Sequence, residues 1–596
     1  MKQRLGYLLK IYLLTILLFV LAKVAFMLFN HEGHTFAATD VMDVIGHGLS
    51  LDSSTGLYFI ILPFLLVVAS LWVNIPRWLY RLYYAIIAVA FALAFVADTS
   101  LYPFWGFKLD ASCLSYLETP TEVAASVSTG YLLIRFVILA ILSYLFYLGY
   151  GCLRTLFKPS RHRLIESLIF LLMLPLMVIG IRGGFGESTT NIGQVYYSQN
   201  QFLNHSAVNP VFSFLYSLSH TMGDTDQYQF MDDDESTALT EAVYTTESIQ
   251  ADTLLNTDRP NIVIILLESA GEQFASAMPY LQRLKKESIF FANCYANSWR
   301  TDRGTLCTLS GYPSFPSLSV MKMPEKSRTL PSIAHSLQQE GYKTRYLYGG
   351  DINFTNMRSY LVATGWEQLV CMDDFTALER RSAKWGVRDD ITFERLSDMI
   401  QKNDTDSRFL IGYSTLSSHE PWDVPIKQHP DEKLNAFAYL DHCLRNFIEP
   451  LKQTAAWQDM LIIMLADHGI NNGDIDQSKP LQKNHIPMLW VGGAVKEPRC
   501  VEALCNQSDL AATLLGQMRL SHEAFTFSRD VLSKGYRYPT AVNNYNNAQL
   551  LIDTTGHILY DFDAKCLTIS ESADSTRLQR LNKAILQVTI NDLKKR

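Results

Sequence analysis

The stretch Asn261-Ile262-Val263-Ile264-Ile265-Leu266-Leu267-Glu268 decides the fold of the C-terminal part of the chain. Its six aliphatic residues run without a polar break, which predicts a strand buried on both faces, as in a parallel sheet. Four later segments have the same character: Lys343–Tyr348, Phe409–Leu416, Met460–Leu465 and Met488–Val491. Helical patterns lie between them, at Thr329–Glu340 and Leu434–Ile448. This alternation predicts an α/β domain with a largely parallel central sheet and a site at the C-terminal ends of its strands.

Residues 1–182 are rich in aromatic residues and leucine and poor in acidic residues. Five apolar segments in this part each approach the ~20 residues that a helix needs to cross ~30 Å of hydrocarbon. They are Ile11–Phe29, Tyr58–Val73, Leu82–Ala97, Tyr131–Tyr150 and Leu164–Ile181. The first is too long for a cleaved signal peptide, and four more follow it. We therefore expect an α-helical membrane domain of five spans over residues 1–182.

The positions of lysine and arginine predict how the spans are oriented. These residues gather before the first span, between the second and third, and between the fourth and fifth: Lys2, Arg4, Lys10, Arg77, Arg81, Arg154, Lys158, Arg161 and Arg163. By the positive-inside rule the N-terminus is cytoplasmic, and everything after Ile181 is extracytoplasmic. Lys23 and Arg135 fall inside predicted spans toward the outer side, where we expect them to snorkel to the interface. A role in binding lipid head groups is the less favoured alternative.

Residues 183–258 are predicted to connect the two halves of the chain. The apolar segment Val211–Leu218 is expected to lie along the membrane surface. Asp224–Asp258 is acidic and rich in threonine and serine, which indicates an exposed linker with a helix around Ser236–Tyr244. The α/β domain is expected at 259–540.

Residues 541–596 are predicted to form a hairpin and a helix packed on the α/β domain. The hairpin is expected over Asn547–Tyr560 and the amphipathic helix over Ser575–Lys595. Neither segment carries residues that suggest chemistry.

Charge and cysteine usage exclude some classes of function. A net charge of −7 argues against a nucleic-acid-binding protein. The nine cysteines lack Cys-x-x-Cys or Cys/His zinc spacing. Cys500 and Cys505 could form a local disulfide if they face an oxidising space, although spacing alone does not assign a pairing.

A candidate nucleophile lies in Asn297-Ser298-Trp299-Arg300-Thr301-Asp302-Arg303-Gly304. This stretch is expected to turn from a loop into a helix that Gly311 ends. A hydroxyl at a helix start lies near unpaired N–H groups and the positive end of the helix dipole, which favour a bound anion. Thr301, between Arg300 and Arg303, could thus attack a phosphate or sulfate ester. The alternative is a threonine that only caps the helix.

Carboxylates and histidines follow or flank the predicted strands at several points: Glu268, Asp351, His419, Asp467, His468 and His485, with Arg358 shortly after Asp351. Taken singly, each could be a helix cap, a turn residue or a hydrogen-bonded histidine. Taken together, a glutamate, an Asp-His pair and a threonine offer oxygen and nitrogen ligands and a reactive oxygen. This set suits Zn²⁺ or Mn²⁺, which would lower the pKa of the threonine hydroxyl.

The combined motifs resemble the lipoteichoic acid synthase type of membrane-anchored sulfatase-like proteins in the alkaline phosphatase superfamily. The matching pieces beyond the five spans are Leu267-Glu268-Ser269, Arg300-Thr301-Asp302-Arg303-Gly304, Ser310-Gly311-Tyr312-Pro313, Tyr348-Gly349-Gly350-Asp351, Arg358, Ser418-His419-Glu420-Pro421, Ala466-Asp467-His468-Gly469 and His485-Ile486-Pro487-Met488. Through this resemblance Glu268, Thr301, Asp467 and His468 are expected to bind one divalent metal, Mn²⁺ or Zn²⁺.

The resemblance also implies roles for the surrounding residues. Thr301 is the expected nucleophile, with Arg300 in support. The expected contacts to the phosphate or head group are Arg303, Asp351, Arg358, His419 and His485, and Arg358 and His419 are also expected to act in catalysis.

The chain departs from the family pattern at two places. Lipoteichoic acid synthases carry a histidine and a tryptophan near the Gly-Asp element, where this chain has Gly349 and Asn356. The arylsulfatase motif Cys-x-Pro-x-Arg is absent, because Cys307 is followed by Thr308-Leu309-Ser310. Sulfate chemistry through formylglycine is therefore not expected.

The resemblance implies a membrane-anchored, metal-dependent transferase at the outer face of a bacterial cell (inner) membrane. It would take phosphoglycerol or phosphoethanolamine from a membrane phospholipid through a phospho-Thr301 intermediate. The acceptor would be a hydroxyl of an envelope glycolipid, glycan or polymer. The alternatives are a phosphodiesterase or phosphatase, a sulfatase, and a catalytically silent membrane regulator of the same fold.

Overall fold

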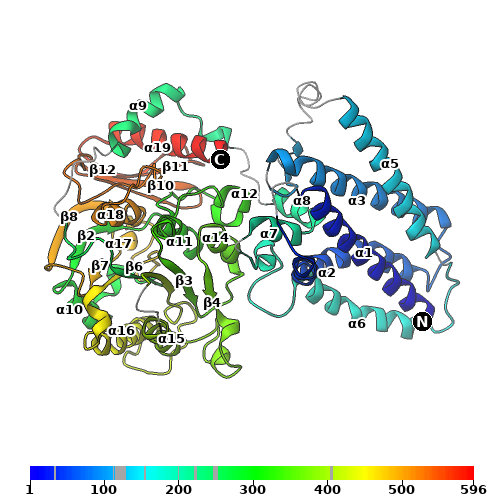
Figure 1. Ribbon diagram of the computed structural model, residues 1–596, viewed down its shortest axis with the longest axis horizontal. Coiled ribbons are helices and arrows are strands. Elements are labelled where there is room, and N and C mark those ends of the chain that lie inside the picture. Colours follow the sequence, from blue (N-terminus) through cyan, green and yellow to red (C-terminus); the bar gives the residue numbers. More distant parts are fainter. Residues whose placement is uncertain are drawn as a thin grey trace. The chain divides into compact units, whose positions relative to one another are not determined.

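The computed structural model of the chain describes residues 1–31, 35–105, 107–111, 113–114, 129–153, 156–198, 200–219, 225–245, 253–402 and 407–596. The chain divides into two compact units, Met1–Thr221 and Met222–Arg596, which are described separately (Figure 1). The predicted connector, 183–258, is thus shared between the two units.

Five long apolar helices make up most of the first unit: α1 (Lys2–Phe29), α2 (Ala38–Ala69), α3 (Arg77–Trp105), α5 (Thr129–Cys152) and α6 (Arg163–Arg182). Each is long and apolar enough to cross a bilayer, which confirms the five predicted segments. The second helix is longer than expected. It begins at Ala38 instead of Tyr58, so that Asp52 lies in the helix and not in an outer loop.

Lys23 does not snorkel as predicted but forms a buried ion pair. Its ammonium binds the carboxylate of Asp52, and both side chains are almost fully buried. Asn209 donates a hydrogen bond to the same carboxylate at 2.9 Å. Burying a charge in a helical bundle is costly unless a partner neutralises it, and Asp52 on the lengthened α2 is that partner. Arg135 instead lies over the Phe29 ring, 5.8 Å from its centroid.

Two short helices of the predicted connector, α7 (Gln201–Ala207) and α8 (Pro210–Ser219), belong to the first unit. The helix predicted around Ser236–Tyr244 is α9 (Asp233–Tyr244) and belongs to the second. The prediction of an exposed linker is wrong for this helix, because α9 packs lengthwise on the C-terminal helix (Figure 1). Asp224 and residues 246–252 of that predicted linker lie outside the described residues.

An eight-stranded sheet forms the centre of the second unit, in the order β4-β3-β5-β1-β6-β7-β2-β8. Its strands are β1 (Asn261–Leu267), β2 (Ile289–Tyr295), β3 (Lys343–Tyr348), β4 (Gln368–Val370), β5 (Phe409–Ser414), β6 (Met460–Ala466), β7 (Met488–Val491) and β8 (Arg499–Asn506). Its helices are α10 (Pro279–Lys285), α11 (Thr301–Ser310), α12 (Pro324–Ser327), α13 (Ile333–Gln339), α14 (Met357–Ala363), α15 (Asp389–Gln401), α16 (Glu432–Leu451), α17 (Pro480–Asn484) and α18 (Leu510–Gln517).

The five predicted strands and the largely parallel sheet are confirmed, but one strand runs the other way. β7 is antiparallel to both of its neighbours, β6 and β2. Its start therefore lies at the sheet edge where the parallel strands end. This reversal explains how a residue before a strand can lie near residues that follow the other strands. The predictions missed β2, β4 and β8, because β4 is short and the other two mix polar with apolar residues.

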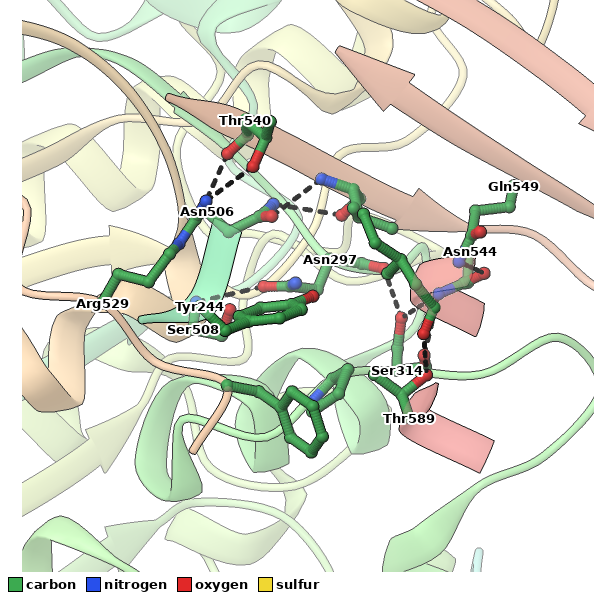
Figure 2. Close-up of a pocket in the computed structure, with 14 residues that line it drawn as sticks. Tyr244, Asn297, Ser314, Asn506, Ser508, Arg529, Thr540, Asn544, Gln549 and Thr589 are labelled. Carbon is green, nitrogen blue, oxygen red and sulfur yellow. Dashed lines mark hydrogen bonds between the residues drawn. The ribbon is translucent and has the colours of Figure 1, made fainter. Parts of the chain in front are cut away.

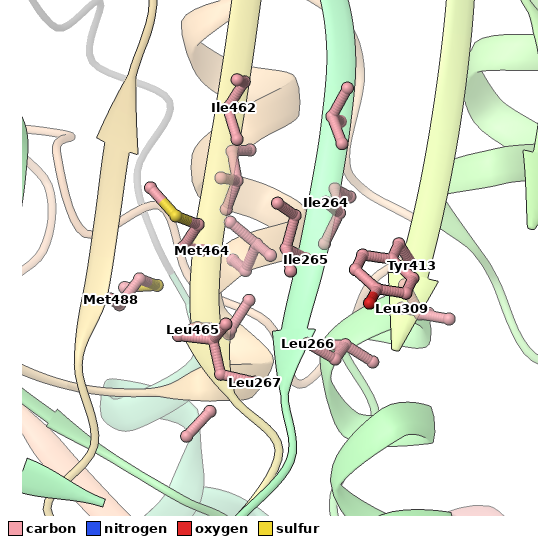
Figure 3. Close-up of a cluster of buried hydrophobic side chains, with 14 of the residues drawn as sticks. Ile264, Ile265, Leu266, Leu267, Leu309, Tyr413, Ile462, Met464, Leu465 and Met488 are labelled. Atoms are coloured by element: carbon pink, nitrogen blue, oxygen red, sulfur yellow. The ribbon is translucent and has the colours of Figure 1, made fainter. Parts of the chain in front are cut away.

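The core of the second unit is built on β1, where every residue after Asn261 is buried. Figure 3 shows Ile264 and Leu266 of this strand between Tyr413 of β5 and Met464 of β6. Because both faces of the strand are covered, its sequence is uniformly apolar and does not alternate. The ends of β1 and β6 are thus fixed by packing, and Glu268 and Asp467 immediately follow them.

A second, antiparallel sheet follows the central domain in the order β12-β11-β10-β9. Its strands are β9 (Thr540–Asn544), β10 (Ala548–Asp553), β11 (Gly556–Asp561) and β12 (Cys566–Ser572), and α19 (Ser575–Lys595) packs against it. The hairpin anticipated from the sequence is the β10–β11 pair of this larger sheet, and α19 has the predicted bounds.

The disulfide considered between Cys500 and Cys505 does not form. Both residues lie on β8, five positions apart, so their side chains point to opposite faces and their backbones are ~16 Å apart. Cys500 is exposed, whereas Cys505 is buried opposite Cys294 of β2.

Candidate active site

The nucleophile candidate lies at the start of α11, as the sequence predicted. Arg300 is the N-cap, no side chain caps the helix, and Thr301 is the first helical residue. Gly311 ends the helix with a φ of 57°, in the left-handed region that glycine tolerates. The Thr301 hydroxyl is therefore not a capping group, and it contacts side chains of other elements.

Four side chains converge at the ends of β1 and β6 and the start of α11. The Thr301 hydroxyl donates to Oε2 of Glu268 at 3.2 Å and lies 3.3 Å from Nε2 of His468. That nitrogen is 3.6 Å from Oε1 of Glu268 and 3.6 Å from Oδ2 of Asp467. One ligand atom each of Glu268, Asp467 and His468 lies within 4.8 Å of the others. The structure thus brings together all four residues proposed as metal ligands.

The donor atoms of this cluster are arranged as a cation would require. Oδ2 of Asp467 is buried and has no hydrogen-bond partner among the described residues. Oδ1 of the same carboxylate accepts from the backbone N–H of Ser269 at 2.8 Å, which fixes the carboxylate. His468 donates through Nδ1 to the carbonyl of Gly469 at 3.2 Å, so the lone pair of Nε2 points to the cluster. Two carboxylates and an imidazole fit a divalent metal.

The pKa shifts of Asp467, Glu268 and His468 are consistent with a site for a divalent metal. Burial and the neighbouring Glu268 carboxylate raise the pKa of Asp467 well above its usual value. For Glu268, burial acts to raise the pKa, but the neighbouring histidines and the hydrogen bonds with Ser269 and Asp467 together lower it, and the net shift of the pKa is downward. Burial lowers the pKa of His468, which favours the neutral imidazole that binds metals. A bound cation would relieve the repulsion between the carboxylates.

One glycine allows α11 to approach the end of β6. A Cβ on Gly304 would overlap the carbonyl oxygen of Asp467. Only glycine lets two backbone segments come this close. The nucleophile helix and the metal-ligand strand are thus packed directly against each other.

Gln507 ties the site together and was not predicted from the sequence. Its side-chain oxygen accepts from the N–H of Asn297 at 2.7 Å. Its side-chain nitrogen reaches the carbonyls of Gly304 and Asp467 at 3.2 and 3.0 Å, and the hydroxyl of Thr308 at 3.0 Å. One fully buried amide therefore joins the nucleophile loop, the nucleophile helix and the strand end.

The second sheet also supports the loop before Thr301. Asn543 of β9 donates to the carbonyl of Ala296 at 2.7 Å, and the N–H of Asn544 donates to the carbonyl of Asn297 at 2.9 Å. Figure 2 shows Asn297 within this polar network, beside a cavity of about 20 Å³ that side chains of α9, β9 and α19 help to line. The C-terminal part, predicted to be only structural, holds the nucleophile loop in place.

His419 has one ring nitrogen available for proton transfer. Its Nδ1 donates to the carbonyl of Glu420 at 2.8 Å, which leaves Nε2 as the basic nitrogen. The ring is half-buried. This tautomer leaves His419 able to accept a proton at Nε2.

The other predicted site residues have different surroundings. Arg358 on α14 donates to the side chain of Asn353 at 2.9 Å, and Asp351 accepts from the N–H of Asn353 at 3.0 Å. Arg300 is exposed and lies over the Trp299 ring at 4.4 Å.

Arg303 and His485 are held by backbone carbonyls. Arg303 is buried and donates to the carbonyl of Phe315 at 3.1 Å. His485 uses Nε2 to bond the carbonyl of Ala292 at 2.8 Å and stacks on Tyr295. The structure does not place these two, or Arg300, in the cluster, and their roles stay predictions.

Two residues near the cluster were missed. Tyr348 ends β3, and the charges of Glu268 and Asp467 act on its phenol, whose pKa burial raises. Lys483 of α17 is buried, and its charge acts on His468. Only Tyr348 could have been found from the sequence, since it ends a predicted strand.

The fold and the cluster define a class of protein. An α/β domain with a mostly parallel sheet carries, at one edge, a hydroxyl at a helix start and a cluster that can hold a divalent metal. Two solved structures share the fold. A protein of the alkaline phosphatase superfamily from Vibrio parahaemolyticus has a TM-score of 0.54 at 24% identity, covering 62% of this chain and 98% of that one. A lipoteichoic acid synthase from Listeria monocytogenes has a TM-score of 0.51 at 16% identity, and the match covers 61% of this chain and 98% of that one.

Residues 260–520 match the model of the Sulfatase family, so this part of the chain is similar to sulfatase-family domains. The five apolar helices make the chain a multi-pass membrane protein. The chain is 24% identical over 396 residues to a lipoteichoic acid synthase-like protein of Bacillus subtilis, covering 58% of this chain and 63% of that one. It is 22% identical over 302 residues to phosphoglycerol transferase I of Xanthomonas campestris, and the match covers 46% of this chain and 43% of that one. The chain therefore spans less than two thirds of the length of these relatives.

Proposed function

We propose that the protein transfers a phospholipid head group, phosphoglycerol or phosphoethanolamine, to a hydroxyl of an envelope glycolipid, glycan or polymer. The single observation that carries this proposal is the position of the Thr301 hydroxyl. It lies at a helix start and contacts Glu268 and His468 beside an unpartnered Asp467 oxygen. The names of the relatives, which include a phosphoglycerol transferase, support the choice of reaction.

In the first step Thr301 Oγ1 attacks the phosphorus of the lipid. The new Oγ1–P bond forms as the bond from phosphorus to the diacylglycerol oxygen breaks, and the threonine proton ends on that oxygen. Glu268 accepts the hydroxyl hydrogen bond and so orients Oγ1. Free backbone N–H groups at the start of α11 favour the negative charge that develops on the phosphoryl oxygens.

In the second step an acceptor hydroxyl attacks the phospho-Thr301 intermediate. Nε2 of His419 takes the acceptor proton, the Oγ1–P bond breaks, and Thr301 ends protonated. His485 is less suited to this role because its Nε2 is engaged by a backbone carbonyl. A divalent metal, Mn²⁺ or Zn²⁺, held by Glu268, Thr301, Asp467 and His468 would supply charge stabilisation and lower the hydroxyl pKa.

The five apolar helices suit a donor that never leaves the bilayer. We place the N-terminus in the cytoplasm and the catalytic domain outside it, at the bacterial cell membrane, on the distribution of lysine and arginine. The predicted segment roles, with a catalytic domain over 259–540, belong to the same proposal.

The test is mass spectrometry of the purified full-length protein incubated with phosphatidylglycerol or phosphatidylethanolamine. We expect a phosphodiester adduct on Thr301 whose mass identifies the head group, and none in Thr301→Ala. Head-group release that depends on an added glycan or lipid acceptor supports a transferase. Equal release to water without any acceptor would indicate a phosphodiesterase instead. Turnover by Thr301→Ala at the wild-type rate would overturn the proposal.

A further inference from the structure

An aromatic side chain from a distant segment packs against the proposed base. The ring centroid of Trp385 is 4.5 Å from that of His419, with the ring planes tilted by 54°. Phe354 meets the same indole edge to face at 5.7 Å. Trp385 lies in the segment Ala383–Asp389, hereafter the Trp385 segment, which ends at the first residue of α15. Nothing in the motifs of the sequence singled out this tryptophan.

Glycines bring the Trp385 segment to this place. The N–H of Val387 donates to the carbonyl of Gly349 at 3.0 Å. A Cβ on Gly349 would lie 2.8 Å from the carbonyl oxygen of Val387, and one on Gly386 would overlap the carbonyl of Gly349. Gly386 also has a φ of 138°, which side chains rarely adopt. The two glycines therefore admit the Trp385 segment at the end of β3.

The last residue of the Trp385 segment holds the loop that carries His419. Asp389 is fully buried, and its carboxylate accepts from the N–H groups of Leu416 and Ser417 at 2.8 and 3.1 Å. Its own N–H donates to the hydroxyl of Ser417 at 2.9 Å. The same short segment therefore fixes both the backbone before His419 and one face of its ring.

We propose that Trp385 is a positioning residue for His419. The Glu420 carbonyl restrains Nδ1, and the indole restrains rotation of the ring. Together they keep Nε2 turned toward the acceptor. This inference rests on the proposed function, because it assigns Trp385 to the second step, in which His419 takes the acceptor proton.

The Trp385 segment should therefore affect the two steps differently. Formation of phospho-Thr301 needs Thr301 and the cluster, whereas the ring contacts of Trp385 are with Phe354 and His419. Transfer to the acceptor needs a correctly turned imidazole, because a base must lie within hydrogen-bond reach of the proton it takes. Loss of the indole should slow the second step while the first continues.

The experiment compares Trp385→Ala, Trp385→Phe and the control Leu378→Ala in the full-length protein. Leu378 belongs to the same stretch between β4 and α15 but is 85% exposed and outside the site. Rapid-quench measurement follows release of diacylglycerol as a burst and transfer to the acceptor afterwards. We expect Trp385→Ala to keep the burst, to slow transfer about 10-fold or more and to shift the pH profile of that step. Trp385→Phe should restore most of the rate, and Leu378→Ala should match wild type.

Equal slowing of both steps, or an unchanged transfer rate in Trp385→Ala, would overturn the inference. A readout independent of turnover separates it from the proposed function. Long-range ¹H–¹⁵N NMR of histidine-labelled protein reports the tautomer of His419, with His419→Gln to assign the signal. We expect the Nδ1–H form in wild type and exchange between both forms in Trp385→Ala. Absence of any adduct on Thr301 in wild type counts against the proposed function, whereas an unchanged His419 signal in Trp385→Ala counts against the role of Trp385.

Discussion

Thr301 is a first-turn residue of a helix whose hydroxyl contacts side chains from two other elements. Its partners lie 33 positions before it and 167 positions after it in the chain. The helix start, the strand end after β1 and the strand end after β6 meet at this oxygen. A hydroxyl held between a carboxylate and a neutral imidazole is suited to nucleophilic attack.

Replacing Thr301 should remove the reaction without harming the fold. Thr301→Ala should lower kcat by at least about 10³-fold, because no other hydroxyl takes its place on α11. Thr301→Ser keeps the oxygen and should retain part of the rate. Steady-state turnover with a lipid substrate measures both, and thermal unfolding of each variant serves as the control for folding. An active alanine variant would contradict the assignment.

Gly304 should be intolerant of even one added carbon. Gly304→Ala places a methyl group against the carbonyl of Asp467, so α11 must move away from the strand end. A shift of about 1 Å in a reacting group costs about 10²-fold in rate, and we expect kcat to fall by that order. Gly341→Ala serves as the control. A Cβ there meets no neighbour but the residue has a positive φ, so this variant shows the effect of backbone strain without any displacement of the site.

Asp389 should make stability depend on pH in the acidic range. Burial raises its pKa from the usual 3.8 to about 6, despite hydrogen bonds that act the other way. The folded state then binds this proton more tightly than the unfolded state, so its contribution to stability is fully present below pH 3.8 and is lost as pH rises to about 6. The loss is about 3 kcal/mol at most. Across this range wild type should lose stability relative to Asp389→Asn in denaturant unfolding, and parallel curves would contradict the shift.

At the scale of elements, the nucleophile loop is held by parts of the chain that carry no catalytic group. Gln507 joins this loop to α11 and to the end of β6, and β9 supports it from the second sheet. The strands, the parallel sheet and the residues after β1 and β6 could be predicted, because uniform apolar runs and the polar residues after them are local signals. The supporting amides could not, because their role depends on tertiary contacts between distant segments.

The same distinction applies to individual elements that were predicted incorrectly. β8 mixes polar and apolar residues at the edge of the central sheet, where it pairs with β2. The length of α2 was missed because Asp52 reads as a loop residue until its partner Lys23 is known. In both places the outcome depends on a contact that is far away in sequence.

Gln507→Met should uncouple these elements. Methionine has a similar volume but cannot bond Asn297, Gly304 or Asp467, which leaves buried backbone groups without partners. Each such group costs about 1–3 kcal/mol, so the variant should lose about 3 kcal/mol or more of stability. Its kcat should fall with it. Thermal unfolding and turnover measure the two effects, and Gln517→Met is a matched control, because the buried side chain of Gln517 accepts from the N–H of Leu254 at 2.7 Å.

At the scale of the whole molecule, an apolar five-helix unit and an α/β domain that is similar to the Sulfatase family share one chain. The orientation of the chain decides which substrates the domain meets. Exposed cysteines in both units allow a direct measurement: Cys152 follows the fourth apolar segment, and Cys500 lies on the surface of the second unit.

A membrane-impermeant maleimide should label Cys500 in intact cells but Cys152 only after lysis. This result follows if residues after Ile181 are extracytoplasmic and the loop after the fourth segment is cytoplasmic. Single-cysteine variants, read by mass shift on a gel, make the two signals separate. Labelling of Cys152 in intact cells would reverse the proposed orientation.

The hold that β9 exerts on the nucleophile loop has a practical consequence for shortening this protein. The segment that matches the Sulfatase family ends at residue 520, and β9 begins at Thr540. A fragment cut to the family boundary would keep every proposed metal ligand and still lose the asparagines that position the loop before Thr301. We therefore expect the shortest active fragment to extend to the end of α19, because residues beyond the family boundary hold the nucleophile loop in position.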